Sequence, residues 1–378
     1  KTSTFLHLLR ASRGMFESDQ LAHLAPRLRQ VDGFESLNGH GLDGLDPVGA
    51  TEAIAHDFLA RGGKYARPFI TLAAYDALTG GHCTAHDGAD CAKALPESVR
   101  RVALSIETFH KASLVHDDIE DDDAFRYGEP TLHRRFGAST AINVGDYLIG
   151  LGYRLVSRES PALGHESAAE ILDLLADAHL RLSEGQGAEL TWRDGGNRQL
   201  TPLDALKIYA LKTAPAFEAA LLCGVRCAGP LGDLHAPLKQ LAKYLGIAFQ
   251  ILNDLKDWQG DDDNKLAAGL DALAGRPTLL WALALESLEE PARADLHAAA
   301  DDAELDDDLR VARIERLYRQ AGVFEKAHQL VDKYQQRALQ VADEVEPESL
   351  RRLLRYLVET VLDRPAPSDP PLVEAKLL

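Results

Sequence analysis

Hydrophobic positions recur at helical spacing along most of this chain. Leu, Ala and Val return every three or four residues in one segment after another, as in helices that bury one face. No alternation of apolar and polar residues is long enough to predict a strand, and the sequence contains no internal repeat and no Gly-rich phosphate loop. The pattern predicts an all-α protein.

Turn and cap residues divide this pattern into separate helices. Gly62-Gly63 ends one helix, and Pro68 suits the first turn of the next. Pro215 should kink the helix in which it lies. Helices are expected from Thr4, from Thr51 and from Pro68, then over 97–123, 139–158, 166–186, 203–223, within 241–263 and through most of 278–363, with a surface loop between the last two regions.

Composition and length suggest three regions. We expect an N-terminal extension at 1–45, a helical main domain at 46–364 and a mobile Pro-rich tail at 365–378. The 46% hydrophobic and 26% charged content is that of a soluble globular protein. No apolar run is long enough to span a bilayer, and the first residues do not form a signal peptide.

The charge of the chain limits its partners. A net charge of −18 argues against nucleic acids and anionic membranes, which attract basic surfaces. An acidic substrate would therefore need cations to mediate its binding. Four cysteines are too few for a disulfide scaffold and suggest the cytoplasm. His82, Cys83, His86 and Cys91 raise a zinc interpretation, but their spacing fits no standard site, and an ordinary loop is the alternative.

The most informative stretch is FHKASLVHDDIEDDDAFRYG, at 109–128. On a helix Asp117 and Asp121 are one turn apart, with Asp118 beside them, so we expect their oxygens to converge on one point. A hard divalent cation with a phosphate ligand would relieve their repulsion. An acidic run is otherwise a solvated face or tail, but the preceding SIETFHKASLVH is too apolar for a tail.

A second polar face follows at 241–263. Gln250, Asp254 and Asp257 recur at three- and four-residue steps. Two acidic clusters that face each other across a helical bundle could hold cations between them, and this pairing is more specific than either cluster alone.

Basic residues complete the set of candidates. In GGKYARP, Lys64 and Arg67 suit an anion such as a diphosphate, although short basic turns are common. Lys212 and Thr213, next to Pro215, either serve a ligand or mark a bend. We interpret His179 as a core or groove histidine rather than as a ligand.

Six motifs taken in order resemble the trans-type polyprenyl synthetase family, the isoprenyl diphosphate synthases. They are GGKYARP, HKASLVHDDIED, RYGEPTLHRRFG, GQGAEL, YALKTA and GIAFQILNDLKD, and they extend from about Gly62 to Thr278. The resemblance implies a bundle of mostly antiparallel helices around a deep pocket, in which two Asp-rich motifs bind Mg²⁺ that holds an allylic diphosphate. It also implies a homodimer.

The resemblance assigns roles residue by residue. The metal ligands would be Asp117, Asp118, Asp121, Asn253, Asp254 and Asp257, and Asp117, Asp118, Asp121, Lys212 and Asp254 would be catalytic. Lys64, Arg67 and His110 would bind isopentenyl diphosphate. The allylic diphosphate or its metals would be contacted by Arg126, Lys212, Thr213, Gln250 and Lys265.

This chemistry requires such a set of residues. Ionisation of an allylic diphosphate puts charge on the departing pyrophosphate, which metals and fixed cations stabilise. Isopentenyl diphosphate must be held close for attack, in a dry pocket. Pyrophosphate itself can take the final proton, so no catalytic histidine is needed.

Three positions depart from the family pattern. Tyr127 stands where a second arginine is usual, and a phenol cannot replace a guanidinium fork. Asn253 replaces the first aspartate of the second motif, and Glu189 stands where aspartate is common. The departures leave open a lower affinity, a different acceptor or a subunit that has lost turnover.

Product length is argued from the residues before Asp117. Ser113, Ala112 and Phe109 lie four, five and eight positions earlier, so we expect them to line the pocket wall. The two small residues leave room beyond C15, and Phe109 would set a floor near C20, unless it is plain core packing. Geranylgeranyl diphosphate is the product that this predicts.

Two other functions compete. A class I terpene cyclase shares the bundle, and Asn253, Asp257 and Asp261 faintly resemble its metal triad, but Gly62–Pro68 has no role there. A non-enzymatic subunit of a heteromeric synthase is the other alternative. The retention of Asp117, Asp118, Asp121 and Lys212 argues against it.

Overall fold

The computed structural model describes residues 3–17, 21, 46–81, 83, 95–195, 199–258, 268–302 and 304–362. In these ranges the regular structure is almost entirely α-helical, as predicted. The only sheet there is a hairpin in which β1 (Phe125–Arg126) pairs antiparallel with β2 (Glu129–Pro130). The hairpin follows the acidic helix directly and carries Arg126 and Tyr127.

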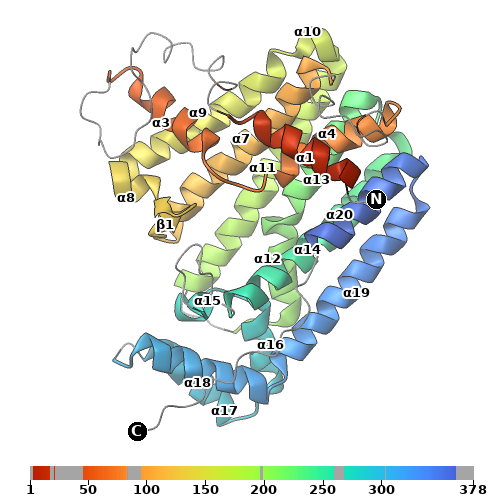
Figure 1. Cartoon of the computed structure of the whole chain (residues 1–378). Helices are drawn as coiled ribbons and strands as arrows, with labels where there is room; N and C mark the ends of the chain where they lie inside the picture. Colours follow the sequence, from red (N-terminus) through yellow and green to blue (C-terminus); the bar gives the residue numbers. More distant parts are fainter. Residues whose placement is uncertain are drawn as a thin grey trace.

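Long helices that pack lengthwise form the centre of the molecule (Figure 1). The acidic helix α7 (Glu97–Glu120) packs against α9 (Ala138–Ser157), α4 (Ala66–Leu78) and α13 (Ala214–Ala228). On one side of α13 lies α11 (His165–Asp194), and α14 (His235–Asp257) packs on it as well. The two helices that carry the acidic motifs therefore belong to one bundle.

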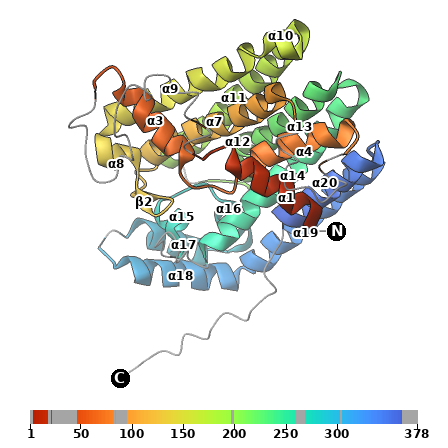
Figure 2. The same ribbon diagram turned by 45° about the horizontal axis from the view of Figure 1, so that its top comes forward.

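Shorter helices surround this centre. They are α1 (Ser3–Gly14), α3 (Ala50–Ala60), α8 (Leu132–Phe136), α10 (Ser160–Leu163), α12 (Pro202–Lys212), the 3₁₀ helix η3 (Gly232–Leu234), α15 (Leu270–Leu273), α16 (Leu279–Ser287), α17 (Ala292–Asp301) and α18 (Asp307–Gln320). The long α19 (Val323–Glu344) and then α20 (Glu348–Val361) complete the described chain. Figure 2 shows α17 and α18 together at one end of the bundle and α19 and α20 along its side.

Two groups of buried apolar side chains hold the fold together. The larger group fills the space between α4, α7, α13, α14 and α19. The smaller one lies under α3 and α9 and includes Ile54, Phe58, Val144 and Leu148. The N-terminal α1 packs on α4, and the ring of Phe5 stacks on that of Tyr356 with centroids 4.2 Å apart.

Helix limits agree with the expected ones where cap residues mark them. Thr201 accepts a hydrogen bond from the amide of Asp204 at 3.2 Å and so caps α12. The helix predicted over 203–223 is two helices, because the chain leaves helical geometry at Thr213, with φ −125°, just before Pro215. The expected kink is thus a complete break. The helix predicted over 166–186 continues to Asp194.

Among the described residues one helical stretch, Pro202–Ala228, is long and apolar enough to cross a membrane by those criteria alone. Of its apolar window, 78% is buried inside the protein. It has the character of a core helix pair.

Candidate active site

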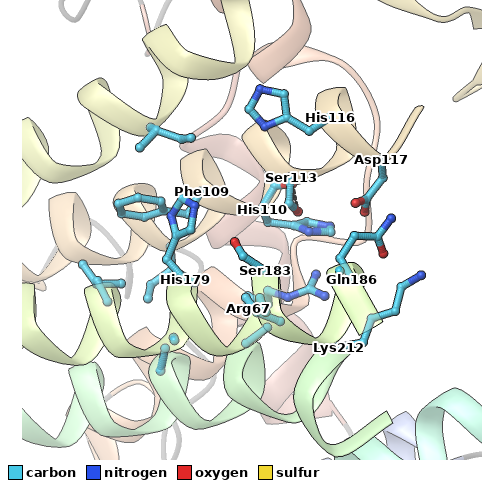
Figure 3. A pocket seen from close by; sticks show the side chains of 18 of the residues that line it. Arg67, Phe109, His110, Ser113, His116, Asp117, His179, Ser183, Gln186 and Lys212 are labelled. Carbon is cyan, nitrogen blue, oxygen red and sulfur yellow. Dashed lines mark hydrogen bonds between the residues drawn. The ribbon is translucent and has the colours of Figure 1, made fainter. Parts of the chain in front are cut away.

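A cavity of about 330 Å³ lies between α7, α11 and α13, with α4, α9 and α12 contributing to its wall. At one end Arg67, His110, Asp117 and Lys212 supply polar groups, and Phe109 lies at the other (Figure 3). The rest of the wall is largely apolar and includes Ile106, Leu175, Leu182, Leu190 and Ala219. Such a cavity suits a ligand with a charged head and a hydrocarbon tail.

The three carboxylates of the first motif do not converge, which corrects the sequence-based expectation. Asp118 is 1% exposed and accepts hydrogen bonds from Nε of Arg126, at 2.8 Å, and from its Nη2. Asp121 pairs instead with Arg193 and Arg276, each at 3.1 Å. Neighbouring positions on a helix point about 100° apart, so Asp118 faces the hairpin.

Asp117 is the carboxylate of this motif that lines the cavity. Its side chain makes no hydrogen bond or ion pair within the described part of the chain. Burial raises its pKa to about 7, with further upward contributions from Glu120 and Asp121, while Lys212 acts in the opposite direction. Burial thus disfavours the ionised form of Asp117, and a cation bound beside it would favour that form.

The second motif is tied into the core through Asp254. This side chain is 2% exposed, accepts a hydrogen bond from the hydroxyl of Tyr209 and accepts another from Nε2 of Gln250 at 3.3 Å. The Tyr209 oxygen in turn accepts from the amide of Leu279 at 2.6 Å. Burial raises the pKa of Asp254 well above its ordinary value. Asn253, predicted as a ligand, is half-buried on the same helix.

The segment after α14 contributes residues that the sequence analysis missed. We expected a surface loop there, but its described part, from 268 onward, includes the single turn α15 and returns to the site. The amide of Asp271 donates to Oδ2 of Asp257 at 3.2 Å, and its carboxylate pairs with Arg276 at 2.9 Å. Burial and the charge of Asp271 raise the pKa of Asp257. Lys265 lies outside the described residues.

Lys212 and Thr213 lie at the break between α12 and α13. Lys212 pairs with Glu189 at 2.8 Å, which raises the pKa of its ammonium, and Thr213 donates to Oε1 of Gln250 at 3.0 Å. Gly185, from the GQGAEL motif, allows α11 to approach this break closely, since a Cβ on Gly185 would lie 2.5 Å from the backbone nitrogen of Lys212. A second, smaller cavity of about 40 Å³ adjoins Lys212 and is lined by residues of both α14 and the segment after it.

Of the basic candidates for isopentenyl diphosphate, Arg67 and His110 line the polar end of the cavity. Arg67 points into it (Figure 3), and among the described residues its Nε is buried without a hydrogen-bond partner. Burial, with the nearby charges of Arg67 and Lys111, lowers the pKa of His110 well below its usual value, so this imidazole is neutral. Lys64 is exposed on the preceding turn. Arg126, as noted, is bound to Asp118.

Phe109 lines the apolar end of the cavity. Its ring meets that of Tyr153 edge-on, with centroids 4.7 Å apart, and that of His179 at 5.9 Å. A Cβ on Gly152 would lie 2.8 Å from the Phe109 ring, so α9 offers a notch for it. Ser113 also lines the cavity, but Ala112 does not: it is 1% exposed in the smaller apolar core. The assignment of Ala112 to the wall is wrong, because its helical position faces α3 and α9.

The remaining candidates have ordinary roles. His179 lines the cavity as a groove histidine, with a pKa lowered by burial and by His116. Cys83 is buried, and the rest of the zinc group lies outside the described residues. Within the described ranges no three His, Cys, Asp or Glu side chains are grouped closely enough to hold a metal ion.

The donor set nevertheless suits Mg²⁺. Asp117 and Asp121 are hard oxygen donors on one helix. Asp271 lines the smaller cavity, and Asp257 accepts a hydrogen bond from its amide. Mg²⁺ is usually bound by one or two carboxylates together with phosphate and water, so a closed cage of protein ligands is not required. The raised pKa values of Asp117 and Asp257 have the sign expected where a compensating cation is to bind.

The family model for polyprenyl synthetases matches residues 49–317, more than two thirds of the chain. The protein belongs to the polyprenyl synthetase family. Members of this family are trans-prenyltransferases, and the resemblance inferred from the six motifs is thereby confirmed.

Curated relatives agree in family and differ in product. A short chain isoprenyl diphosphate synthase of Methanothermobacter thermautotrophicus is 29% identical over 307 residues, which are 81% of this chain and 88% of the relative. A geranylfarnesyl diphosphate synthase of Aeropyrum pernix is 30% identical over 309 residues, 79% of this chain and 91% of the relative.

Solved structures share the fold. The crystal structure of a geranylgeranyl pyrophosphate synthase from Corynebacterium glutamicum, complexed with isoprenyl diphosphate and magnesium, superposes with a TM-score of 0.77. The two chains are 24% identical, and the match covers 97% of this chain and all of the other. This similarity confirms the all-α isoprenyl synthase fold.

Proposed function

We propose that this prenyltransferase joins isopentenyl diphosphate to an allylic diphosphate in a Mg²⁺-dependent reaction, giving a longer trans-prenyl diphosphate and pyrophosphate. The observation that carries the proposal is one cavity with acidic and basic groups at one end and an aromatic floor at the other. The allylic diphosphate would lie at Asp117 and Lys212, with its hydrocarbon chain toward Phe109. Isopentenyl diphosphate would bind beside Arg67, His110 and Lys64.

The bonds change as follows. The allylic C–O bond breaks and its electron pair leaves with pyrophosphate. The double bond of isopentenyl diphosphate then attacks the allylic carbon, and a proton passes to pyrophosphate as the new double bond forms. Lys212 and Arg276 are fixed cations that stabilise the charge on the leaving group.

Magnesium would be held by Asp117 and Asp121 on α7 and by Asp257 and Asp271 across from them. When bound, Mg²⁺ supplies further Lewis-acid stabilisation of the leaving group. Arg193 and Arg276, which pair with Asp121, would be fixed cations beside this metal site. Asp118 and Asp254 would orient Arg126 and Tyr209 rather than bind metal directly, which revises the ligand set expected from the resemblance.

The neutral His110 fits a positioning role for isopentenyl diphosphate. Together with Arg67, whose Nε lacks a partner among the described residues, it gives that substrate hydrogen-bond donors near the reacting carbons. The apolar walls keep water from the allylic cation.

We propose a C20 product, since Phe109 lines the apolar end of the cavity. We also propose a homodimer, as the resemblance implies, acting in the cytoplasm, where the free thiols of Cys223 and Cys227 would persist.

Incubation with an allylic diphosphate alone tests the proposal against a terpene cyclase. We expect no hydrocarbon or alcohol and no fast pyrophosphate release until isopentenyl diphosphate is added. Rapid cyclic or linear terpene formation without it would contradict the proposal. Absence of pyrophosphate release from the purified protein under all substrate combinations would favour a non-catalytic subunit.

A further inference from the structure

A buried ammonium group lies directly behind the turn that carries Lys64. Lys111 is 0% exposed, and its Nζ donates to the carbonyl oxygen of Arg61 and, at 3.0 Å, to that of Gly62. Two carbonyl acceptors on consecutive residues fix the orientation of the turn. A buried lysine is costly unless its charge is compensated, so its retention calls for an explanation.

Three aromatic rings surround this ammonium. Its Nζ lies 4.2 Å from the centroid of Tyr127, 5.3 Å from that of Phe58 and 5.9 Å from that of Tyr65. Each distance is within the range of cation–π attraction, and the Tyr127 contact is the shortest. The carboxylate of Glu107, 2% exposed, supplies negative charge to Lys111 and to Arg67.

The same tyrosine also packs on the turn itself. Gly62 has φ +49°, and a Cβ on it would lie 2.5 Å from Cγ of Tyr127. At Gly63, with φ +113°, the position of a Cβ is 3.6 Å from Oε1 of Glu107, 3.7 Å from the Tyr127 hydroxyl and 3.8 Å from Nζ of Lys111. The 61–64 turn is therefore held by hydrogen bonds from Lys111 and by packing against the ring of Tyr127.

We propose that Lys111 and Tyr127 are a coupled positioning pair that fixes the 61–64 turn, and with it Lys64 and Arg67, for the diphosphate of isopentenyl diphosphate. The pair takes the place of the arginine that the family resemblance leads one to expect at position 127. This inference rests on the proposed function, because it names how the basic side of that site is held.

The residue types at positions 111 and 127 depend on each other for an electrostatic reason. An arginine at position 127 would add a cation against the buried Lys111, whose pKa is already lowered by burial and by the charge of Arg126, and like charges repel strongly there. An aromatic ring at the same position attracts the ammonium. Lys111 is thus compatible with Tyr127 and not with an arginine in its place, whereas a neutral residue at position 111 reverses this preference.

The test compares four variants: Lys111→Met, Tyr127→Phe, Tyr127→Arg and the double variant K111M/Y127R. We expect Lys111→Met to raise the KM for isopentenyl diphosphate roughly tenfold or more, about 1.4 kcal/mol, with the KM for the allylic diphosphate within about twofold of its original value. Tyr127→Phe keeps the ring and should raise the KM for isopentenyl diphosphate less than Tyr127→Leu, which removes the ring. Tyr127→Arg alone should be impaired, and the double variant should recover most of the loss.

A matched control is Lys326→Met. Lys326 also donates to a backbone carbonyl, that of Ala321 at 3.1 Å, but on the exposed surface far from the cavity. It should change neither KM. If Lys111→Met does not fold, as judged by its thermal transition, Tyr127→Leu replaces it, with Tyr127→Phe as its reference and the same expected rise in KM.

Direct calorimetric binding of isopentenyl diphosphate separates this inference from the proposed function. If the unmodified protein shows no turnover but its binding of isopentenyl diphosphate weakens about tenfold in Lys111→Met, the proposed function is refuted. The positioning role of Lys111 and Tyr127 would still be supported. Folded variants whose binding and KM for isopentenyl diphosphate are unchanged, or whose KM rises equally for both substrates, would overturn the pair. So would a double variant no better than either single one.

Discussion

At the scale of residues, the candidate site is a set of charges that partly neutralise one another. Asp118 is bound by Arg126, and Asp121 by Arg193 and Arg276. Asp117 has no such partner among the described residues, and burial raises its pKa to about 7. In the absence of metal this carboxyl should therefore cost stability whenever it is ionised.

Replacement of Asp117 by asparagine should change how stability depends on pH. The folded-state pKa of about 7 exceeds the ordinary value of 3.8, so the folded protein binds more protons than the unfolded chain between these limits. The contribution of Asp117 is fully present below pH 3.8 and is lost as the pH rises through 7. Relative to the Asp117→Asn variant, the protein should lose up to about 1.4 kcal/mol per pH unit in this window.

Urea unfolding of the metal-free proteins at pH 5 and pH 7.5 measures this difference. The two curves should diverge toward pH 7.5, where Asp117→Asn becomes the more stable protein. Parallel pH profiles would show that Asp117 ionises normally in the folded state and would remove the electrostatic reason for a cation at this position.

Sequence reasoning could name residues of one helix but not their partners on others. Spacing placed Asp117 and Asp121 one turn apart, yet nothing in it indicated that Arg193 or Arg276 would reach Asp121. The same limit explains Ala112, whose distance along α7 was right and whose direction was wrong. Helical periodicity gives relative angles within one helix, and tertiary packing decides which angle faces the cavity.

At the scale of elements, the site depends on close contact between α11 and the break that separates α12 from α13. Gly185 faces the nitrogen of Lys212, and Gly246 on α14 faces Ala214 from the other side. The sequence predicted a bend from Pro215, because a missing N–H is a local property. The contacts of α11 and α14 with this bend join residues far apart in the sequence. They could not be predicted from local patterns.

Gly185→Ala should misplace Lys212. The added methyl group would lie 2.5 Å from the backbone nitrogen of Lys212. Helices α11 and α12 must therefore move apart, which lowers the free energy of unfolding by about 1–3 kcal/mol. We expect a lower thermal midpoint and a fall in kcat larger than the change in either KM. Gly150→Ala on α9 is the control, since a Cβ there meets nothing within 4 Å. Equal kcat values in the Gly185→Ala variant and the unmodified protein would contradict the assigned position of Lys212.

At the scale of the whole molecule, the bundle encloses a cavity that is charged at one end and apolar along its length. Periodicity predicted the helices, because it is a pattern within single segments, whereas the bundle and its pocket were expected only from the family resemblance of the six motifs. The break of the C-terminal region into α16 to α20 and the return of the 268–276 segment to the site follow from contacts distant in sequence. These were found only in the structure.

Phe109→Ala should lengthen the product. The ring lines the apolar end of the cavity and packs against Tyr153 and His179, so its removal opens the floor toward the notch at Gly152. Product chains analysed by reversed-phase chromatography should shift beyond C20. Phe249→Ala, which removes a ring that packs on Phe217 rather than lining the cavity, should leave the lengths unchanged. An unaltered distribution in Phe109→Ala would mean that Phe109 is core packing.

The central claim is most directly tested by product analysis with Mg²⁺, labelled isopentenyl diphosphate and each of the C5, C10 and C15 allylic diphosphates. We predict label in a trans-prenyl diphosphate, with C20 as the main end point from all three starters, and no product when Mg²⁺ is chelated. A protein that incorporates no isopentenyl diphosphate with any starter would contradict the proposed function.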